Sequence, residues 1–420
     1  MLLEFTVGNT LSFYANKTLS LQAQSLKDIE ENVAHVSSYR ILKSLALYGA
    51  NSSGKSNLIN SLAIMRHTVL SSVQLNPNDS LYFDPFLLFK NNNKPCFFEI
   101  VFLLDEQLYR YGFSYTEKKI IDEWLFCRKT KRSKEQTLFL RNEKGIAYSD
   151  ETFPEAIGLE TKTNDNRLFL SLCAQLGGYV SNQIVSWFDR NLNVISGLEN
   201  QDYRAFSKEQ FHEKKEISLK ALGFFKTLQL GFNEISTHEE DMTIPSNLPK
   251  ELVPIVNKKI VGKKKIQVES VHNLYNNKGI CGTINFSFDE NESSGTRKLF
   301  DLSGPIFDTL RIGSVLVVDE LDAKMHPLIS QQIINLFNNS ETNPNNAQLI
   351  FTTHDTHLLS TKKIRRDQIW FTEKNDKEQT DLYCLTDIIL PDGTKVRNDA
   401  NYEKNYIAGR YGAIPYIVNE

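Results

Sequence analysis

The sequence predicts an α/β protein: a mixed sheet that carries helices, an antiparallel β lobe and an inserted helical arm. Three observations favour this class. From Lys298 onward the pattern alternates helix, strand, helix, strand, which is typical of a parallel sheet covered by helices. Residues 97–141 form strand-like segments separated by charged turns. Between residues 166 and 256 the apolar positions change to helical spacing.

Length and composition set the outer limits. The 420 residues suffice for two or three domains, and we expect them at 1–150, 151–285 (mostly helical) and 286–420. The net charge of −3 does not favour nucleic-acid binding through overall charge, although a local basic patch stays open. There is no apolar run of about 18 residues and no signal-peptide pattern, and the five cysteines are scattered without a CxxC pair. We therefore expect a cytoplasmic protein without membrane spans, disulfides or zinc.

The elements follow in order along the chain. The first 20 residues alternate roughly apolar and polar, which predicts a hairpin with one buried face. Residues 41–48 form an apolar strand, and a helix is predicted from Ser56 to about Val73. After the strands at 97–141 and the helical stretch, short strands are expected again at 257–290.

The segment "GANSSGKS" at 49–56 fits the pattern G-x-x-x-x-G-K-[ST], between an apolar strand and a helix. Glycines let successive backbone N–H groups point at one phosphate, and the helix N-terminus adds partial positive charge. The lysine would reach the β- and γ-phosphates, and the following serine hydroxyl would coordinate Mg²⁺. A chance match in a strand-turn-helix is the alternative. We expect ATP and Mg²⁺ here, with these binding residues: Gly49, Asn51, Gly54, Lys55, Ser56 and Asn57.

A second motif is the apolar strand that ends in Asp319 and Glu320. A carboxylate at the carboxyl end of a strand can hold the Mg²⁺ shell, and an adjacent glutamate can accept a proton from the attacking water. We therefore predict Asp319 as a metal-binding residue and Glu320 as a catalytic one. A buried strand that merely ends in acidic turn residues is the alternative.

A third motif is the apolar strand at 348–352, which runs into Thr353 and His354. A histidine at a strand end is usually structural. Because this strand is the next one after the Asp-Glu strand, we predict that His354 senses the γ-phosphate. His357 has no such placement, and we expect it to be structural.

Two weaker patterns lie upstream of the Asp-Glu strand. Ser293, Ser294 and Gly295 lead into a predicted helix, whose free N–H groups would suit an anion. A simple helix cap explains the same residues. Five lysines lie between Lys258 and Lys265; a solvated strand and turn is a commoner explanation for such a run than contact with a phosphate backbone.

In order, these motifs are a phosphate loop, a long insert, a small-residue signature, Asp-Glu and Thr-Thr-His. That order resembles the ATPases of the ABC superfamily, in their SMC-like and OLD-like branch. The stretches "SSGTRKLFDL", "DELDAKMHP", "RRDQIWFTEK" and "YEKNYIAGRYGAIP" resemble stand-alone bacterial ATPases of the OLD-like group. Those are typically encoded beside a separate effector in anti-phage, abortive-infection or restriction-linked loci. The resemblance covers about residues 1–130 and 285–420.

The resemblance implies an ABC-type ATPase head whose halves flank the insert, with ATP bound between two heads of a head-to-head dimer. Glu320 would be the catalytic base and His354 the switch histidine. The residues expected to act across the dimer interface are Ser293, Ser294, Gly295, Leu321 and Asp322. Gln74 lies in a plausible region for the glutamine of the γ-phosphate loop, but no motif surrounds it.

The leading hypothesis is an ATPase that serves as sensor or regulatory component of bacterial anti-phage defence. Only 66 residues follow His354 (420 − 354), too few for the Toprim nuclease of full-length OLD proteins. We therefore expect a separate effector chain, a nuclease or another toxin. We further expect a homo-oligomer of at least two copies, and a trigger that is DNA or a phage protein.

Two other functions were weighed. The alternative is a DNA-repair or chromosome-maintenance ATPase that clamps DNA in an ATP-dependent dimer. The motor subunit of a transporter is less favoured, because the signature departs from the transporter pattern and residues 97–141 do not suggest a coupling domain.

Overall fold

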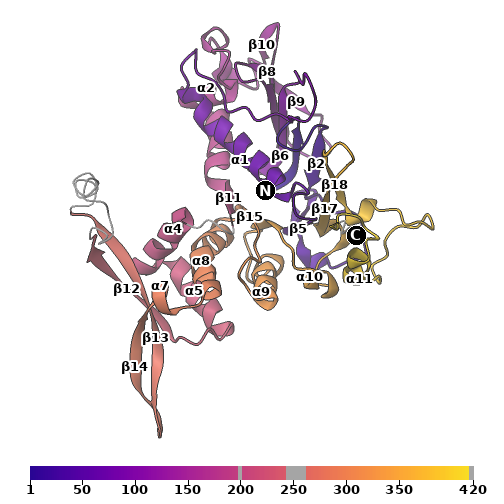
Figure 1. Ribbon diagram of the computed structural model, residues 1–420. Helices are drawn as coiled ribbons and strands as arrows, with labels where there is room; N and C mark the ends of the chain where they lie inside the picture. The colour runs from indigo at the N-terminus through magenta and orange to yellow at the C-terminus, as the bar shows by residue number, and fades with distance from the viewer. Residues whose placement is uncertain (197–200, 243–261, 416–420) are drawn as a thin grey trace. The chain divides into compact units, whose positions relative to one another are not determined.

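The computed structural model describes residues 1–196, 201–242 and 262–415, which group into two compact units (Figure 1). Unit 1 comprises residues 1–198, 312–323 and 330–420. Unit 2 comprises residues 199–311 and 324–329. Unit 1 is therefore built from both ends of the chain.

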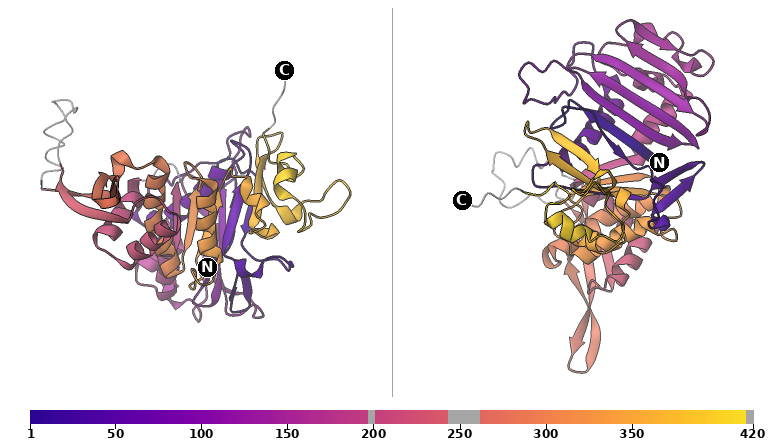
Figure 2. Two further views of the ribbon diagram at one scale, coloured as in Figure 1. Left: turned by 90° about the horizontal axis from the view of Figure 1, so that it is seen from below. Right: turned by 90° about the vertical axis from the view of Figure 1, so that its right-hand side faces the viewer.

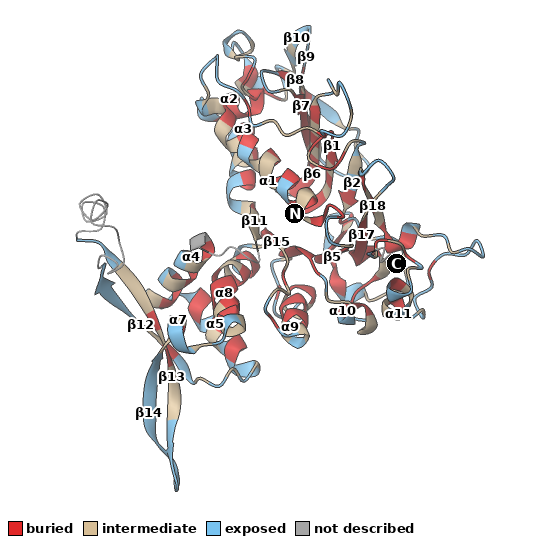
Figure 3. Cartoon of the chain, in the orientation of Figure 1, coloured by how far each residue is buried: buried red, intermediate tan, exposed pale blue. Residues whose placement is uncertain are grey.

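The core of unit 1 is a six-stranded sheet. In spatial order its strands are β11 (Leu192–Ser196), β15 (Val315–Asp319), β16 (Gln348–Thr352), β5 (Ser44–Tyr48), β17 (Ile369–Lys374) and β18 (Thr380–Cys384). The first five run parallel, and β18 pairs antiparallel with β17. The central strands are short, apolar and almost entirely buried, as expected of a parallel sheet covered on both faces (Figure 3).

Unit 1 also contains a seven-stranded antiparallel sheet (Figure 2, right). In spatial order its strands are β10 (Gly145–Tyr148), β9 (Gln136–Asn142), β8 (Ile120–Arg128), β7 (Gln107–Tyr115), β6 (Cys96–Leu104), β1 (Leu2–Gly8) and β2 (Lys17–Ser20). This arrangement confirms the hairpin predicted in the first 20 residues and the antiparallel strands predicted at 97–141.

A small hairpin, β3 (Val33–Val36) and β4 (Tyr39–Leu42), precedes β5. The single strand predicted at 41–48 is therefore two strands that break at Lys43. The Lys43 side chain is buried, and its ammonium donates to the carbonyl oxygens of Glu31 (3.0 Å) and Asn338 (3.1 Å).

Helix α1 (Lys55–Ser71) confirms the helix predicted from Ser56. It packs against β15 and β11 of the core sheet and against β1 of the antiparallel sheet. Its buried apolar side chains recur every three or four residues: Leu58, Ile59, Leu62, Met65 and Val69. Through this helix the two sheets of unit 1 share one core.

The mostly helical insert predicted at 151–285 is divided differently in the structure. Helices α2 (Phe169–Gln175) and α3 (Tyr179–Ser186) lie in unit 1. Trp187, directly after α3, stacks on Phe102 of β6 with ring centroids 4.2 Å apart. Part of the stretch expected to form a separate arm thus completes the core beneath the antiparallel sheet.

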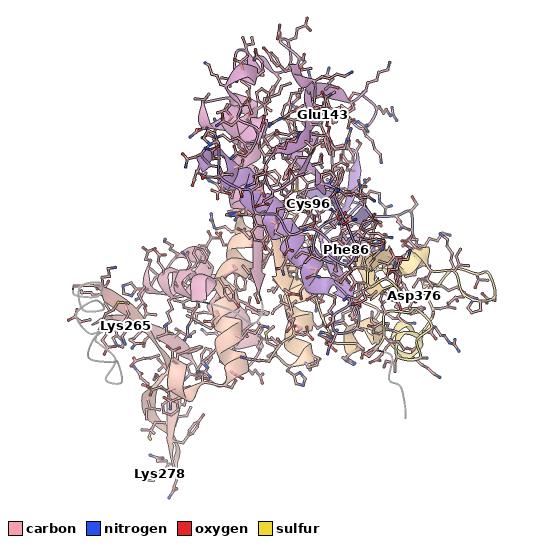
Figure 4. All side chains as sticks on the ribbon, turned by 45° about the horizontal axis from the view of Figure 1, so that its top comes forward. Phe86, Cys96, Glu143, Lys265, Lys278 and Asp376 are labelled. Carbon is pink, nitrogen blue, oxygen red and sulfur yellow. The ribbon has the colours of Figure 1, made fainter. Side chains whose placement is uncertain are left out.

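Unit 2 combines helices with a three-stranded antiparallel sheet. Its elements are α4 (Gln201–His212), α5 (Glu216–Thr227), β12 (Glu234–Asp241), β13 (Lys264–Asn276), β14 (Gly279–Ser287), α7 (Phe288–Asn291) and α8 (Ser294–Ile312). The short strands expected at 257–290 are in fact a long hairpin of β13 and β14, with Lys278 at its turn (Figure 4). The insert expected to be mostly helical thus contains a three-stranded sheet beside its helices.

The lysine run at 258–265 falls partly in this hairpin, and its first two lysines lie outside the described residues. Across the strand pair, Lys264 meets Glu239 at 2.7 Å and Lys265 meets Glu240 at 3.2 Å. These cross-strand ion pairs account for the two lysines without a phosphate partner.

The remaining helices are α9 (Pro327–Asn338), α10 (His357–Ser360) and α11 (Tyr402–Ile407). Over the residues that the structure describes, we find no helix that combines the length and the apolar character needed to cross a membrane.

A buried cation fixes the start of β17. Arg365 is almost completely buried, and its guanidinium donates to both carboxylate oxygens of Asp367, at 2.9 and 3.0 Å. It also donates to the carbonyl oxygens of Gln24 and Ile29. The pair therefore ties the N-terminal segment to the strand that lies beside β5.

Replacing Asp367 by Asn should destabilise the protein by about 3–5 kcal/mol, because buried Arg365 would lose its counter-charge at 2.9 Å and keep only the half-exposed carboxylate of Glu30 at 3.5 Å. Urea-induced unfolding followed by circular dichroism would measure this as a lower midpoint. As a control, Asp399→Asn removes an exposed pair with Arg397 and should leave the midpoint unchanged. Equal midpoints for Asp367→Asn and the wild type would contradict the role given to the buried pair.

Candidate active site

The candidate site lies where the carboxyl ends of β15, β16, β5 and β17 meet. In register, Thr352 of β16 is paired with Leu47 of β5, and Tyr48 of β5 is paired with Phe371 of β17. Since the strands are parallel, the residues that follow each of them reach the same edge of the sheet. Strand β16 lies between β5 and β15, so the histidine strand separates the phosphate-loop strand from the Asp-Glu strand.

Residues from these strand ends line a cleft of about 500 Å³. Its size is within the usual range for small-ligand pockets. The phosphate loop supplies residues 51–57, and three other strand ends supply Glu320, His354 and Lys374. The structure thus brings together these residues predicted from the sequence: Asn51, Gly54, Lys55, Ser56, Asn57, Glu320 and His354.

Strands β17 and β18 pack closely against the phosphate loop. Gly54 has φ 112°, in the left-handed region, and a Cβ there would lie 2.2 Å from Thr380 Oγ1. At Gly49 a Cβ would lie 2.5 Å from the carbonyl oxygen of Thr372. The Thr380 hydroxyl donates to the carbonyl oxygen of Ser53 at 3.0 Å. Both glycines are therefore required by close packing against β17 and β18 as well as by the path of the loop.

Lys55 is buried at the start of α1, and its ammonium donates to the carbonyl oxygens of Gly49 (2.8 Å) and Ala50 (3.0 Å). Burial lowers the pKa of this ammonium, while nearby carboxylates, Asp319 foremost, oppose the shift. Phosphate groups in the cleft would add negative charge beside the ammonium and favour its charged form.

The Ser56 side chain lines the cleft, and the described residues offer its hydroxyl no hydrogen-bond partner. In the described part of the chain, no three His, Cys, Asp or Glu side chains are arranged to hold a metal ion by themselves. Mg²⁺ in nucleotide enzymes takes one or two protein ligands and completes its shell with phosphate oxygens and water. Ser56 lines the cleft and suits such a shared site, whereas Asp319 does not line the cleft, and its expected role as a metal ligand stays a prediction.

Thr352 positions the Asp-Glu pair. Its hydroxyl donates to Asp319 Oδ1 at 2.6 Å and accepts the backbone N–H of Glu320 at 2.7 Å. Glu320 has φ 56°, which costs a residue with a Cβ about 1–2 kcal/mol. This conformation turns the chain sharply at the strand end, and the Glu320 side chain lines the cleft.

A hydrogen bond within the chain joins Asp322 to the backbone of His354. The backbone N–H of His354 donates to Asp322 Oδ2 at 3.2 Å. The Leu321 side chain is fully buried within the chain. The loop after β15 therefore supports the histidine, and its expected role across a dimer interface stays a prediction.

Some predicted residues are not part of this cleft. Ser293, Ser294 and Gly295 begin α8 in unit 2, where the Ser293 hydroxyl accepts the backbone N–H of Thr296 at 3.1 Å, as in a helix cap. Gln74 follows α1, whose 17 residues separate it from the phosphate loop by about 25 Å along the helix axis. Gln74 is therefore too far away to serve as the glutamine of the γ-phosphate loop.

Lys374, the second cation that lines the cleft, was not predicted from the sequence. It ends β17, and its ammonium lies 3.6 Å from the carboxylate of Glu378. The available signal was a charged residue at the end of an apolar segment, "IWFTEK", which the sequence alone did not place beside β5.

Comparison with known proteins adds one match. A family model described as "AAA domain, putative AbiEii toxin, Type IV TA system" matches residues 44–360, which include the phosphate loop, the Asp-Glu pair and the histidine. No curated protein matches the chain.

Replacing Lys374 by Ala should weaken ATP binding about 10- to 100-fold, because a charge-assisted hydrogen bond contributes about 1.5–3 kcal/mol. Isothermal titration calorimetry would measure the change, with Lys55→Ala as the variant expected to lose binding altogether. Lys377→Ala is the matched control. Lys377 lies in the turn between β17 and β18, three residues after Lys374, and does not line the cleft. Unchanged affinity in Lys374→Ala would remove this residue from the site, and unchanged affinity in Lys55→Ala would refute the phosphate loop.

Proposed function

Because the chain belongs to the family of AAA domains described as putative AbiEii toxins of type IV toxin–antitoxin systems, we propose that it is an ATP-hydrolysing switch in bacterial anti-phage defence. In this proposal it senses infection, or relays the signal, and controls a separate effector chain. The effector is a nuclease or another toxin.

One observation carries the enzymatic part of the proposal. Glu320 and His354 line the same cleft as the phosphate loop, although they come from strands more than 260 residues downstream of Lys55 (320 − 55 = 265). A structural acidic turn and a structural histidine would not need to share that cleft. Their convergence supports hydrolysis rather than nucleotide binding alone.

Each residue has a role that its position supports. Lys55 and the loop N–H groups would bind the β- and γ-phosphates, and Ser56 with Asp319 would hold Mg²⁺. Mg²⁺ supplies neutralisation of the charge that develops on the phosphate oxygens. Glu320 would accept the proton of the attacking water, and His354 would report the γ-phosphate to the loop that holds Asp322.

The defence role is supported by the family's connection with abortive infection. The motifs after β14 also resemble stand-alone ATPases of the OLD-like group, which work with separate effectors. Together these two lines of support favour a regulatory ATPase over a chromosome-maintenance enzyme.

We also propose that two chains share each ATP site. The start of α8 has the features of a signature: a Ser293 cap, small residues and an N-terminus that can bind an anion. Gly295 is constrained by close approach, since a Cβ there would lie 2.7 Å from the carbonyl oxygen of Lys324. A partner chain would present this N-terminus to ATP held by Lys55.

Replacing Glu320 by Gln should lower ATP turnover by a factor of about 10²–10⁴, because the shape is kept while the base is lost. Phosphate release would be measured beside ATP affinity, which should stay near that of the wild type. Glu341→Gln, an exposed substitution outside the cleft, is the control and should not change turnover. If Glu320→Gln retained wild-type turnover, another group would have to act as the base.

Mixing two inactive variants should restore ATPase activity if the sites are shared. In a Lys55→Ala and Ser294→Arg mixed dimer, both defects fall on one composite site, and the other site joins two intact walls. Activity should return on mixing once labelled chains show that subunits exchange. Confirmed exchange without recovery, together with an ATP-bound structure whose γ-phosphates lie far from residues 293–295, would rule out the shared site.

A further inference from the structure

The turn between β8 and β9 carries the densest positive charge of the described residues. Residues 128–134, "RKTKRSK", contain five basic side chains in seven positions; we call this segment the basic turn. The whole chain has a net charge of −3, so this concentration is local. The effect of these charges depends on the hydrogen bonds that fix the segment and on the carboxylates near it.

The basic turn is folded rather than loose. The Thr130 backbone N–H donates to Ser133 Oγ at 3.0 Å, and the Ser133 backbone N–H donates to Thr130 Oγ1 at 3.1 Å. These reciprocal bonds fix the two residues between them, Lys131 and Arg132, at the tip. The cations are therefore presented from a pre-formed scaffold, which reduces the entropy lost on binding.

The cations of the basic turn face solvent without carboxylate partners. Four side chains are exposed and form no ion pair with any described residue: Lys129, Lys131, Arg132 and Lys134. The next acidic residue, Glu135, is engaged by Arg110 at 2.6 Å. Lys131 lies over the ring of Tyr39 at 5.7 Å, which leaves its charge in place.

Two lysines of β13 differ from those of the basic turn. Lys264 and Lys265 are paired with carboxylates across β12 and β13. The neighbouring β6–β7 turn holds Asp105 and Glu106, yet neither forms an ion pair with the basic turn among the described residues. Four unneutralised cations on one hydrogen-bonded turn are suited to a partner with closely spaced negative charges.

We propose that the basic turn binds the phosphate backbone of double-stranded DNA. Duplex DNA carries one negative charge per about 1.7 Å of its axis, which matches a compact cluster of cations. Lysine and arginine contacts to phosphates are independent of sequence, and the basic turn carries no aromatic side chain to stack on bases. The proposal is independent of ATP hydrolysis, because the basic turn contributes nothing to the cleft lining.

The test is fluorescence anisotropy of the full chain with a labelled duplex of about 30 base pairs, between about 50 and 200 mM salt. The variant replaces the four exposed cations of the basic turn by Gln. The control replaces four lysines elsewhere by Gln: Lys118, Lys119, Lys264 and Lys265. Both change the net charge from −3 to −7 (−3 − 4), so overall charge is matched.

The variant should bind DNA at least tenfold more weakly at low salt, and its slope of log K against log salt should be shallower by up to about 3.6 (0.9 × 4). The control should keep most of the wild-type affinity, and both should keep wild-type ATPase activity. The proposal fails if the wild type does not bind duplex DNA, if variant and control lose affinity equally, or if single-stranded RNA binds more tightly than the duplex.

Discussion

The edge of the sheet that carries the candidate site depends on the hydroxyl of Thr352. This hydroxyl donates to Asp319 and accepts from the backbone of Glu320, so one side chain orients both acidic residues. Thr352 is also in register with Leu47, the penultimate residue of β5, and β5 leads directly into the phosphate loop. One position therefore takes part in the strand pairing and also orients the two acidic residues. The left-handed turn at Glu320 is tolerated because these bonds hold it in place.

The Lys55 ammonium is the buried positive charge of the cleft. It is satisfied by two backbone carbonyl oxygens of its own loop, and Asp319 favours its charged form. Bound phosphate would replace these neutral carbonyl acceptors by negatively charged oxygens, so that the ammonium would hydrogen-bond to its counter-charge. Lys374, at the end of β17, adds a second cation whose present neighbour, Glu378, is mostly exposed. Binding of phosphate would give the ammonium groups of Lys55 and Lys374 new hydrogen-bond partners. Both groups supply their positive charge before the phosphate binds.

The sequence predicted the parts of this site that local chemistry specifies. The phosphate loop, Glu320 and His354 belong to motifs whose spacing reflects their function, and the structure places all three at one cleft. The sequence alone could not place Lys374 at the site, because this residue reaches the cleft only through the pairing of β17 with β5. Gln74 lay in a plausible region of the sequence for the glutamine of the γ-phosphate loop, but the length of α1 carries it away from the loop. Similarly, helical spacing near Trp187 indicated a helix correctly but could not say that its ring stacks on Phe102.

The strand order also has a consequence for biosynthesis. Strand β5 is flanked by β16 and β17, and its partner Leu349 follows Ser44 by 305 residues (349 − 44). At about 5–20 residues per second, this strand, which is buried along its whole length in the folded protein, waits roughly 15–60 s on the ribosome for its first neighbouring strand. Chains that stop before residue 348 would therefore expose this strand permanently and would be targets for chaperones and proteases. Antiparallel pairing of β6 to β9 is local and can form during that interval, so the β lobe would fold first and the nucleotide cleft last.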